Sequence, residues 1–405
     1  MERRRAGRTL APMSKIAHRS DPARVLVAGG GVAALETALA LHDLADERVE
    51  VELRAPRAEF VYRPVAVGEP YGAAQVQRYD LTDLAERCGA TFRLGGIVSV
   101  DVGAREATTR DGERVPYDYL LVTPGARMLW AVPGAVTFWG VADEGGVGAV
   151  IHKLRVGGLR RVVFTMPDGQ SWTLPVYELP LLAARVLARS GVEDAHLTVV
   201  TPEEAPLQVF GRAVAEQVGS LLEERGIEVV AGAHPVEFDG TRLRIAPGEP
   251  VPAEAVISLP RLEGRRIDGI PHDAEGFVAV DAHCRVEGLD GVFAAGDVTN
   301  FPVKQGGIAA QQADVAASAI ARELGADIES VAFDPVLRGV LWTGAEPRYL
   351  YGHLAGGHGE TSTMDERPPW PQPEEKIVGK YLSEFLAASV DGQGPRGAAK
   401  KPSRR

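Results

Sequence analysis

The chain has 405 residues, of which 45% are hydrophobic and 24% are charged, a composition typical of globular proteins with two or three domains. Its net charge of −11 argues against a general role in nucleic-acid binding, and no apolar run approaches the ~18 residues of a membrane-spanning helix. The two cysteines, Cys88 and Cys284, are too few for a disulfide framework or a structural zinc site. They suggest a reducing compartment, and we expect a cytoplasmic protein.

Both ends of the chain are basic. Residues 1–22 contain several arginines but no apolar core segment, so they are not a secretory signal, and we expect a disordered arm. The first strand begins only near Arg24, which makes Met13 an alternative to Met1 as the true start. Residues 391–405 form a basic tail with glycine and proline, which we also expect to be disordered.

The most informative stretch begins at Arg24, where a short apolar segment ends in three glycines and an Ala/Leu-rich segment follows. The small residues have the spacing Gly29-x-Gly31-x-x-Ala34. Gly29 allows a tight turn, Gly31 allows the backbone to approach a pyrophosphate, and Ala34 allows the helix to pack closely on the strand. Free N–H groups at the start of the helix attract phosphate. A glycine-rich turn without a ligand is the alternative, but the strand–turn–helix context favours dinucleotide binding.

The next strand, 49–53, alternates strictly and contains a candidate ribose ligand. An acid about 20 residues after the glycines commonly binds ribose hydroxyls, and Glu52 has that distance. Val49, Val51 and Leu53 share the other face of the strand, so a solvated Glu52 is an equally good interpretation.

Local patterns predict the elements that follow. We expect a helix from Asp80 to Cys88, a hairpin region over 91–118 with Asp111-Gly112 as a turn, and a buried strand over 117–122. The buried strand runs directly into Thr123-Pro124-Gly125.

A second unit begins near residue 145. Strands are predicted over 159–166, 196–200 and 227–230, and helices over 175–190 and 212–225. This βαβαβ order, following the first strand–helix unit, predicts an α/β fold with two Rossmann-like, doubly wound domains. The loop 167–175 has one glycine, two prolines and a tryptophan, so a dinucleotide pyrophosphate could not approach its backbone in the usual way.

A third informative stretch, 291–298, is an apolar strand that ends in Gly296-Asp297. A carboxylate at a strand tip suits a sugar or ribityl hydroxyl. Lys304 lies just before a small-residue helix that begins near Gly306, a position that suits a ligand oxygen with negative charge. A solvated loop lysine is the alternative interpretation.

The C-terminal region is expected to contain two interface strands within 331–365 and, after a proline-rich linker, an amphipathic helix. Ile377, Tyr381 and Phe385 recur at i, i+4 and i+8. Such a helix packs on its own protein, on the second subunit of a homodimer, or on a membrane surface. Three nearby acids favour the first two: Glu374, Glu375 and Glu384.

Three segments together resemble the FAD-binding elements of two-dinucleotide-binding-domain flavoproteins of the pyridine nucleotide-disulfide oxidoreductase type: Gly29–Ala34, Leu121–Arg127 and Val292–Asp297. In that superfamily the first segment binds the FAD pyrophosphate. The second corresponds to an Ala-Thr-Gly motif, here Thr123-Pro124-Gly125. The third carries the aspartate that binds the ribityl chain, matched by Asp297. The resemblance covers roughly residues 24–345 and implies FAD as the cofactor.

Within that superfamily the chain is most similar to the branch with sulfide:quinone oxidoreductase, flavocytochrome c sulfide dehydrogenase and type II NADH dehydrogenase. The segments that carry this likeness are Phe60–Pro64, Pro175–Glu178 and Pro302–Gly307. Taken with the glycine and aspartate motifs, the resemblance implies cofactor contacts for Gly29, Gly31, Ala34, Glu52, Arg63, Gly125, Gly296, Asp297 and Lys304.

The resemblance also implies that one domain is inserted in the other. The expected boundaries are 23–140 with 268–330 for the FAD-binding domain, 141–267 for a degenerate NAD(P)-binding-like domain, 331–365 for the interface strands and 366–390 for the linker and amphipathic helix.

The chain departs from its sulfide-oxidising relatives in its cysteines. Those relatives use cysteines beside the flavin, one of them in the second-domain loop, where this chain has Ser171-Trp172. Cys88 and Cys284 lie in separate segments and are more typical of buried structural thiols than of a redox pair. The familial mechanism of sulfide oxidation therefore lacks its cysteines.

Lys304 and Glu178 are the candidate catalytic residues. A lysine near an anionic reduced flavin would raise the reduction potential of the flavin. Glu178 is either a proton relay, since quinone reduction consumes two protons, or a residue that complements the helix dipole. Tyr177 and Trp172 either wall the pocket or pack the domain seam. We expect no metal site, because metal-ligand spacing is absent from His272, His283, His353 and His358.

These patterns predict an FAD-dependent oxidoreductase that passes electrons from an unidentified small-molecule donor to a quinone-like acceptor. Peripheral contact with the inner face of a membrane, or a homodimer, would use the C-terminal helix. Two alternatives remain open: an NAD(P)H dehydrogenase with a non-standard nucleotide loop, and a flavin-binding scaffold without turnover.

Overall fold

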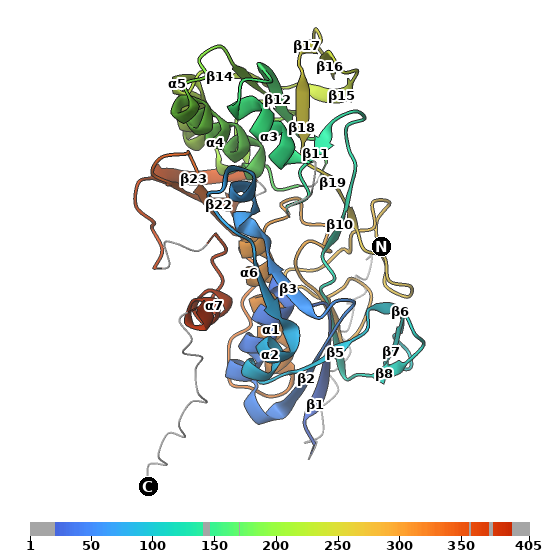
Figure 1. Ribbon diagram of the computed structural model, residues 1–405. Helices are drawn as coiled ribbons and strands as arrows, with labels where there is room; N and C mark the ends of the chain where they lie inside the picture. The colour runs from blue at the N-terminus through green and yellow to red at the C-terminus, as the bar shows by residue number, and fades with distance from the viewer. Residues whose placement is uncertain (1–20, 141–145, 170, 356–357, 372–375, 391–405) are drawn as a thin grey trace, which may run out of the picture.

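The computed structural model describes residues 21–140, 146–169, 171–355, 358–371 and 376–390. The expected basic tail, and all but the last two residues of the expected basic arm, lie outside these ranges. Figure 1 shows two lobes, each built around a sheet, with extended strands running between them.

A five-stranded parallel sheet forms the core of the first lobe, in the order β20-β9-β1-β2-β5. Strands β9 and β20 are apolar throughout, because the sheet is covered on both faces. The strands are β1 (Ala23–Ala28), β2 (Val49–Ala55), β5 (Thr91–Leu94), β9 (Tyr119–Val122) and β20 (Val292–Ala294).

Two long helices cover one face of this sheet, α1 (Val32–Leu44) and α6 (Gly306–Glu323), and they pack against each other (Figure 1). Both bury mainly alanine, including Ala34 and Ala313, so that the helix backbones lie close together and close to the sheet. The predicted short helix is confirmed as α2 (Leu81–Arg87), which Asp80 caps by accepting hydrogen bonds from two backbone N–H groups.

The other face of the sheet is covered by an antiparallel hairpin sheet. Its strands are β6 (Ile97–Asp101), β7 (Glu106–Thr109) and β8 (Arg114–Pro116), and they pack on Leu26 and Leu120. The predicted turn at Asp111-Gly112 is confirmed, with Gly112 at a φ of 90°. Between β2 and the helix α2 lie η2 (Arg63–Tyr71) and the paired strands β3 (Glu59–Tyr62) and β4 (Gln77–Asp80).

The second lobe repeats the parallel α/β arrangement, with strand order β11-β18-β12-β13-β14. The predicted βαβαβ series is confirmed as β12 (Arg161–Thr165), α4 (Leu174–Ser190), β13 (His196–Val200), α5 (Arg212–Glu224) and β14 (Ile227–Val230). The sheet is completed by β11 (Val136–Thr137) and β18 (Ala255–Ser258). Helix α3 (Val147–Arg155) and the antiparallel strands β15 (His234–Phe238), β16 (Arg242–Ala246) and β17 (Val251–Pro252) complete the lobe.

Two antiparallel strands carry the chain out of the first lobe and back into it. β10 (Ala126–Leu129) pairs with β19 (Arg261–Gly264), so the second lobe is an insertion in the first. Because β11 already belongs to the second sheet, that lobe begins a few residues before the expected boundary at 141.

A third sheet follows α6 and packs on the second lobe. It has three strands, β21 (Val336–Leu341), β22 (Arg348–Ala355) and β23 (His358–Asp365), one more than the sequence predicts. Leu337, Leu341 and Leu350 join the core of the second lobe. Gly339 and Gly352 let this sheet lie close to Phe210, which ends η3 (Gln208–Phe210).

The C-terminal helix α7 (Leu382–Val390) packs against α1, and its apolar residues Leu382, Phe385 and Leu386 join the core of the first lobe. This apolar face is therefore covered by the same chain and not by a membrane or a partner subunit. The helix begins at Leu382 and not near Ile377. From the first turn of the helix, the hydroxyl of Ser383 donates to the Ile377 carbonyl and accepts from the backbone N–H of residue 379, which holds the segment before the helix in a turn.

Among the described residues, no helix combines the length and the apolar character needed to cross a membrane.

The docking of α7 depends on a buried acid in α1. The Glu36 carboxylate is fully buried and accepts hydrogen bonds from the backbone N–H groups of Tyr381 (2.9 Å) and Leu382 (2.7 Å). The Tyr381 hydroxyl donates to Asp43 on the same helix at 2.9 Å. The Arg87 guanidinium lies over the ring of Phe385.

We predict that Glu36→Gln lowers the free energy of unfolding by about 1–3 kcal/mol, because the amide NH2 then faces a backbone N–H that has lost its acceptor. Urea unfolding and limited proteolysis at the C-terminus measure the effect. Glu47→Gln, at an exposed position just after α1, is the control. Equal stability of the two variants would contradict this assignment.

Candidate functional site

A cavity of about 760 Å³ lies between the lobes, within the range of ~300–1,000 Å³ that ligand sites occupy. The strand ends of the first sheet, the second-lobe loop, the start of α6 and the C-terminal segment all contribute to its wall. The lining residues that the argument uses are Gly29, Gly31, Arg54, Arg57, Arg63, Arg110, Gly125, Trp172, Glu178, Arg265, Arg266, Gly296, Asp297, Lys304, Gly306, Val340, Lys376 and Ile377.

The glycine loop meets the geometric requirements that the sequence implies. A Cβ atom at Gly29 would lie 2.2 Å from the carbonyl oxygen of Thr123, so no larger residue fits where the chain leaves the neighbouring strands β1 and β9. A Cβ at Gly31 would meet nothing within 4 Å, so the backbone there is open to the cavity. Ala34 does not line the cavity. It is buried in the first-lobe core, where a small residue allows close helix packing.

Two further glycines shape the same wall. Gly125 has a φ of 70° and Gly296 a φ of 83°, backbone conformations that glycine adopts without strain. A Cβ at Gly296 would also lie 3.2 Å from Ala309 and 3.3 Å from Ala33, at the crossing of α1 and α6. The Gly296 N–H donates to the side chain of Gln312 at 2.8 Å, which fixes the turn that carries Asp297.

Three of the predicted cofactor-binding residues, one acidic and two basic, lie close together in the wall: Asp297, Arg63 and Lys304. Burial raises the pKa of Asp297, and the nearby positive charges of Lys304 and Arg63 oppose that rise. Burial lowers the pKa of Arg63, and the neighbouring Arg57 and Arg265 lower it further. The cluster therefore combines one half-buried carboxylate with an excess of positive charge, which suits a ligand that bears both hydroxyl groups and anionic groups.

Lys304 is buried, which excludes the interpretation of a solvated loop lysine. Its ammonium donates to the carbonyl of Thr299 and lies 3.9 Å from the centre of the Phe277 ring. Burial lowers the pKa of Lys304 to about 8, with Asp297 opposing the change. Its backbone N–H donates to the carbonyl of Ser171 at 3.2 Å, so Lys304 also joins the first lobe to the second-lobe loop.

Glu52 does not line the cavity. Its carboxylate pairs with Arg54, and with Arg93 at 3.4 Å, because the three side chains share one face of β2 and β5. The expectation of a ribose contact is therefore corrected: Arg54, two residues later, holds the strand-end position on the cavity wall.

Glu178 does line the cavity and is fully buried, but its partner was not predicted. The Glu178 carboxylate receives hydrogen bonds from the ammonium of Lys376 and, at 2.8 Å, from the backbone N–H of Trp342. Lys376 itself is buried and lies 4.3 Å from the centre of the Trp342 ring. No local pattern marks Lys376, because its partner precedes it by 198 residues. Contacts with the third sheet and the C-terminal segment thus hold the Glu178 carboxylate in position. This role is separate from any interaction of the carboxylate with the dipole of α4.

Trp172 and Tyr177 have different roles. Trp172 lines the cavity and packs edge-on against Phe210. Tyr177 is buried away from it, and its hydroxyl donates to Glu203 at 2.6 Å. Glu203 follows β13, and its carboxyl group lies beside the loop 167–175. The Thr173 hydroxyl of that loop donates to it at 3.4 Å.

Neither cysteine lines the cavity. Cys88 and Cys284 are both buried in the first-lobe core, and burial raises the pKa of each thiol to about 12. Thiols with such pKa values remain protonated and poorly nucleophilic at neutral pH.

The cavity fits a dinucleotide whose fixed end lies at the glycine loop. The open backbone at Gly31 begins helix α1, where phosphate is attracted, and Asp297 supplies a half-buried carboxylate on the same wall. FAD has both a pyrophosphate and a polyhydroxyl chain, so the donor set matches it.

Comparison with known proteins leads to the same class. The family model described as pyridine nucleotide-disulphide oxidoreductase matches residues 181–319. Together with the similarity to sulfide-quinone reductase described below, this match supports an FAD-dependent oxidoreductase, and the two-lobed fold is that of the solved sulfide:quinone oxidoreductase structure.

The relatives are more specific. The sulfide-quinone reductase of Aquifex aeolicus is 24% identical over 305 residues, which cover 69% of each chain. The solved structure of sulfide:quinone oxidoreductase from the same species has a TM-score of 0.77, with 20% identity and 92% of each chain covered. An NADH dehydrogenase-like protein of Mycobacterium tuberculosis is 24% identical over 295 residues, which cover 68% of this chain and 72% of the relative.

The buried Glu203 predicts a pH dependence. Burial raises the pKa of Glu203 from 4.5 to about 7, so between these values the folded protein binds more protons than the unfolded chain. Stability from this group is fully present below pH 4.5 and declines as the pH rises through 7.

Glu203→Gln should remove that decline. We expect the melting temperature of the variant, relative to wild type, to rise progressively between pH 5 and 8. Glu204→Gln, at the exposed neighbouring position, should show a constant difference. Parallel profiles for wild type and Glu203→Gln would show that the carboxyl does not titrate in this range.

Proposed function

We propose that the protein transfers electrons from a small-molecule donor through FAD to a quinone-like acceptor. The observation that carries this proposal is the buried Glu178–Lys376 pair, set among apolar residues in the wall of the same cavity as the glycine loop. Trp172, Val340 and Ile377 provide a surface for a planar apolar ring. Similarity to sulfide-quinone reductase over most of both chains supports the choice of acceptor.

FAD would supply the electron chemistry when bound, and the protein residues would position it and handle protons. Reduction of a quinone consumes two protons. Burial raises the pKa of Glu178 and lowers the pKa of Lys376, and ion pairing opposes both shifts. These opposite shifts bring the proton affinities of the two groups closer together, which suits Glu178 as the proton relay to an acceptor in the apolar part of the cavity.

The position of Ile377 links the C-terminal segment to the cofactor end of the cavity. Its side chain lies within van der Waals distance of Gly306, at the start of α6, and its N–H donates to the Tyr62 hydroxyl at 3.2 Å. The acceptor region would thus be closed on one side by Lys376 and Ile377. To reach a quinone in a membrane, the protein would bind peripherally to the inner face of that membrane. The binding surface would be different from the face of α7 that is buried in the first lobe.

The donor is the less determined half of the reaction. Sulfide is a candidate because of the relatives, although both cysteines are buried away from the cavity. NAD(P)H is the second candidate, and similarity to an NADH dehydrogenase-like protein favours it. Two features weigh against NAD(P)H: the glycine-poor loop 167–175, and the Glu203 carboxyl turned inward to Tyr177 where a nucleotide would bind.

An anaerobic reductant screen tests the proposal. Purified holoenzyme is mixed with sulfide, NADH or NADPH, and bleaching of the flavin absorbance is followed. We expect one donor to bleach the flavin and a soluble quinone to restore the oxidised spectrum. Reduction by a donor without reoxidation by any quinone would refute the proposed acceptor. Reduction by NADH or NADPH, but not by sulfide, would favour the dehydrogenase alternative.

Lys304 offers a sharper test of how the site tunes its cofactor. If its positive charge faces the flavin, Lys304→Met should make the reduction potential more negative by about 30 mV or more, which for a two-electron couple is about 1.4 kcal/mol. The reduced anionic flavin loses its counter-charge in this variant. Lys304→Arg keeps the charge and should keep the potential within about 10 mV. Spectroelectrochemical titration measures both, and an unchanged potential in Lys304→Met would place the ammonium away from the flavin.

A further inference from the structure

The end of β2 lacks the acid that usually faces a bound adenosine. In the register of the sheet Arg54 lies beside Ala28, the residue immediately before Gly29, so it stands next to the pyrophosphate-binding loop. The residues after it, from Ala55 to Arg57, contain no carboxylate. Arg54 nevertheless lines the cavity, and its side chain is only 4% exposed.

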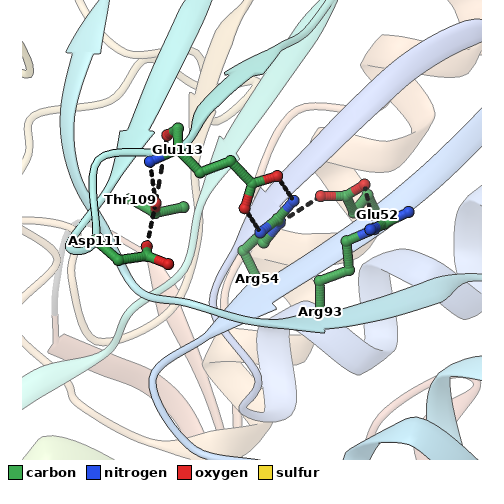
Figure 2. A network of polar contacts seen from close by, with 6 residues as sticks. All are labelled: Glu52, Arg54, Arg93, Thr109, Asp111 and Glu113. Carbon is green, nitrogen blue, oxygen red and sulfur yellow. Dashed lines mark hydrogen bonds and ion pairs between the residues drawn. The ribbon is translucent and has the colours of Figure 1, made fainter.

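Arg54 is held in one orientation by two carboxylates. Glu113 receives hydrogen bonds from both terminal nitrogens, at 2.6 and 2.8 Å, and Glu52 accepts from the Nε–H. Figure 2 shows these two acids on opposite sides of the guanidinium, with Arg93 beyond Glu52. A bidentate pair fixes both position and plane, which a single contact would not do.

Glu113 comes from the hairpin turn and not from the first sheet. The turn is fixed around Thr109, whose hydroxyl donates to Asp111 at 2.5 Å and accepts from the Glu113 N–H at 3.0 Å (Figure 2). The same turn places Arg110 on the cavity wall, where its N–H donates to the carbonyl of Gly96. The hairpin therefore closes the end of the cavity nearest to β2.

The guanidinium still has donors to offer. Of its five N–H groups, the contacts with Glu52 and Glu113 use three, one on each nitrogen. A second N–H remains on each of the two terminal nitrogens, and the side chain faces the cavity. In a Rossmann-type site the adenosine lies beyond the glycine loop, next to the end of the second strand.

We infer that Arg54 binds the adenosine half of FAD, donating hydrogen bonds to ribose oxygens or adenine nitrogens, and that Glu113 and Glu52 are positioning residues that hold it there. The pair takes over the role that a strand-end acid has in other sites of this kind. It makes the cofactor preference for FAD over FMN depend on Arg54, because FMN lacks the adenosine.

A purely structural role, in which the pair only fastens the hairpin to the sheet, makes a different prediction. Loosening the hairpin would weaken every flavin, whereas losing an adenosine contact weakens FAD alone. The ratio of FAD to FMN affinity separates the two roles, since it does not respond to a general loss of stability.

The experiment incubates holoenzyme with excess FMN over a range of added FAD and identifies the bound flavin after rapid desalting. Four variants are compared with wild type: Arg54→Met, Arg54→Lys, Glu113→Gln and Arg93→Met. We expect Arg54→Met to lower the preference for FAD at least 10-fold, the loss expected for hydrogen bonds from a charged donor. Arg54→Lys and Glu113→Gln should lower it less, because a donor remains but is poorly placed.

Arg93→Met is the matched control, because Arg93 belongs to the same network, is 61% exposed and does not line the cavity. It should keep the wild-type preference. An unchanged preference in Arg54→Met, or an equal fall in Arg93→Met, would overturn the inference. If Arg54→Met yields no folded protein, the preference measured for Arg54→Lys and Glu113→Gln decides in the same way.

Discussion

The distance of 2.2 Å between the Thr123 carbonyl oxygen and the place where a Cβ of Gly29 would stand is the constraint on which the site depends. It lets β1 and β9 end at the same level, so that the glycine loop and the Thr123–Gly125 turn form one continuous wall. Gly296 has the same role where α1 and α6 cross, because a Cβ there would lie 3.2 Å from Ala309 and 3.3 Å from Ala33. Close approach of backbones at the carboxyl edge of the first sheet thus creates the cavity, and the alanines of α1 and α6 maintain it from behind.

The charged residues of the cavity wall are mainly basic, whereas the chain as a whole is acidic. The protein carries a net charge of −11, yet arginines and lysines outnumber acids along the cavity wall. Gathering several cations around one cavity is costly, as the lowered pKa values of Arg63, Arg265 and Lys304 indicate. An anionic cofactor with a pyrophosphate relieves that cost, so binding of FAD and stability of the fold are expected to be coupled.

The C-terminal segment belongs to the site as well as to the fold. Lys376 contacts the buried acid Glu178 at the cavity, and the backbone N–H groups of Tyr381 and Leu382 contact the buried Glu36 on the helix behind the glycine loop. Between them, Ile377 covers the start of α6. The apolar face of the C-terminal helix thus becomes part of the first-lobe core. Burying this face stabilises the fold, because apolar surface is removed from water.

The sequence by itself determined the α/β class, the glycine loop, the Gly296-Asp297 turn and the absence of a second nucleotide fingerprint. These features depend on the spacing of residues that are close together in the sequence, so they can be predicted without a structure. It also indicated Lys304 and Glu178, because each lies beside a helix start in a recognisable motif.

Only the tertiary structure decided which charges meet. Glu178 finds Lys376 across 198 residues and Arg54 finds Glu113 across 59, and no local periodicity encodes such pairs. The same reason explains the correction at Glu52: its strand spacing is right for ribose, but Arg54 and Arg93 lie on the same face of the sheet and take its carboxylate. Side-chain pairing across a sheet is set by strand register and by neighbouring turns, which exist only once the chain has folded.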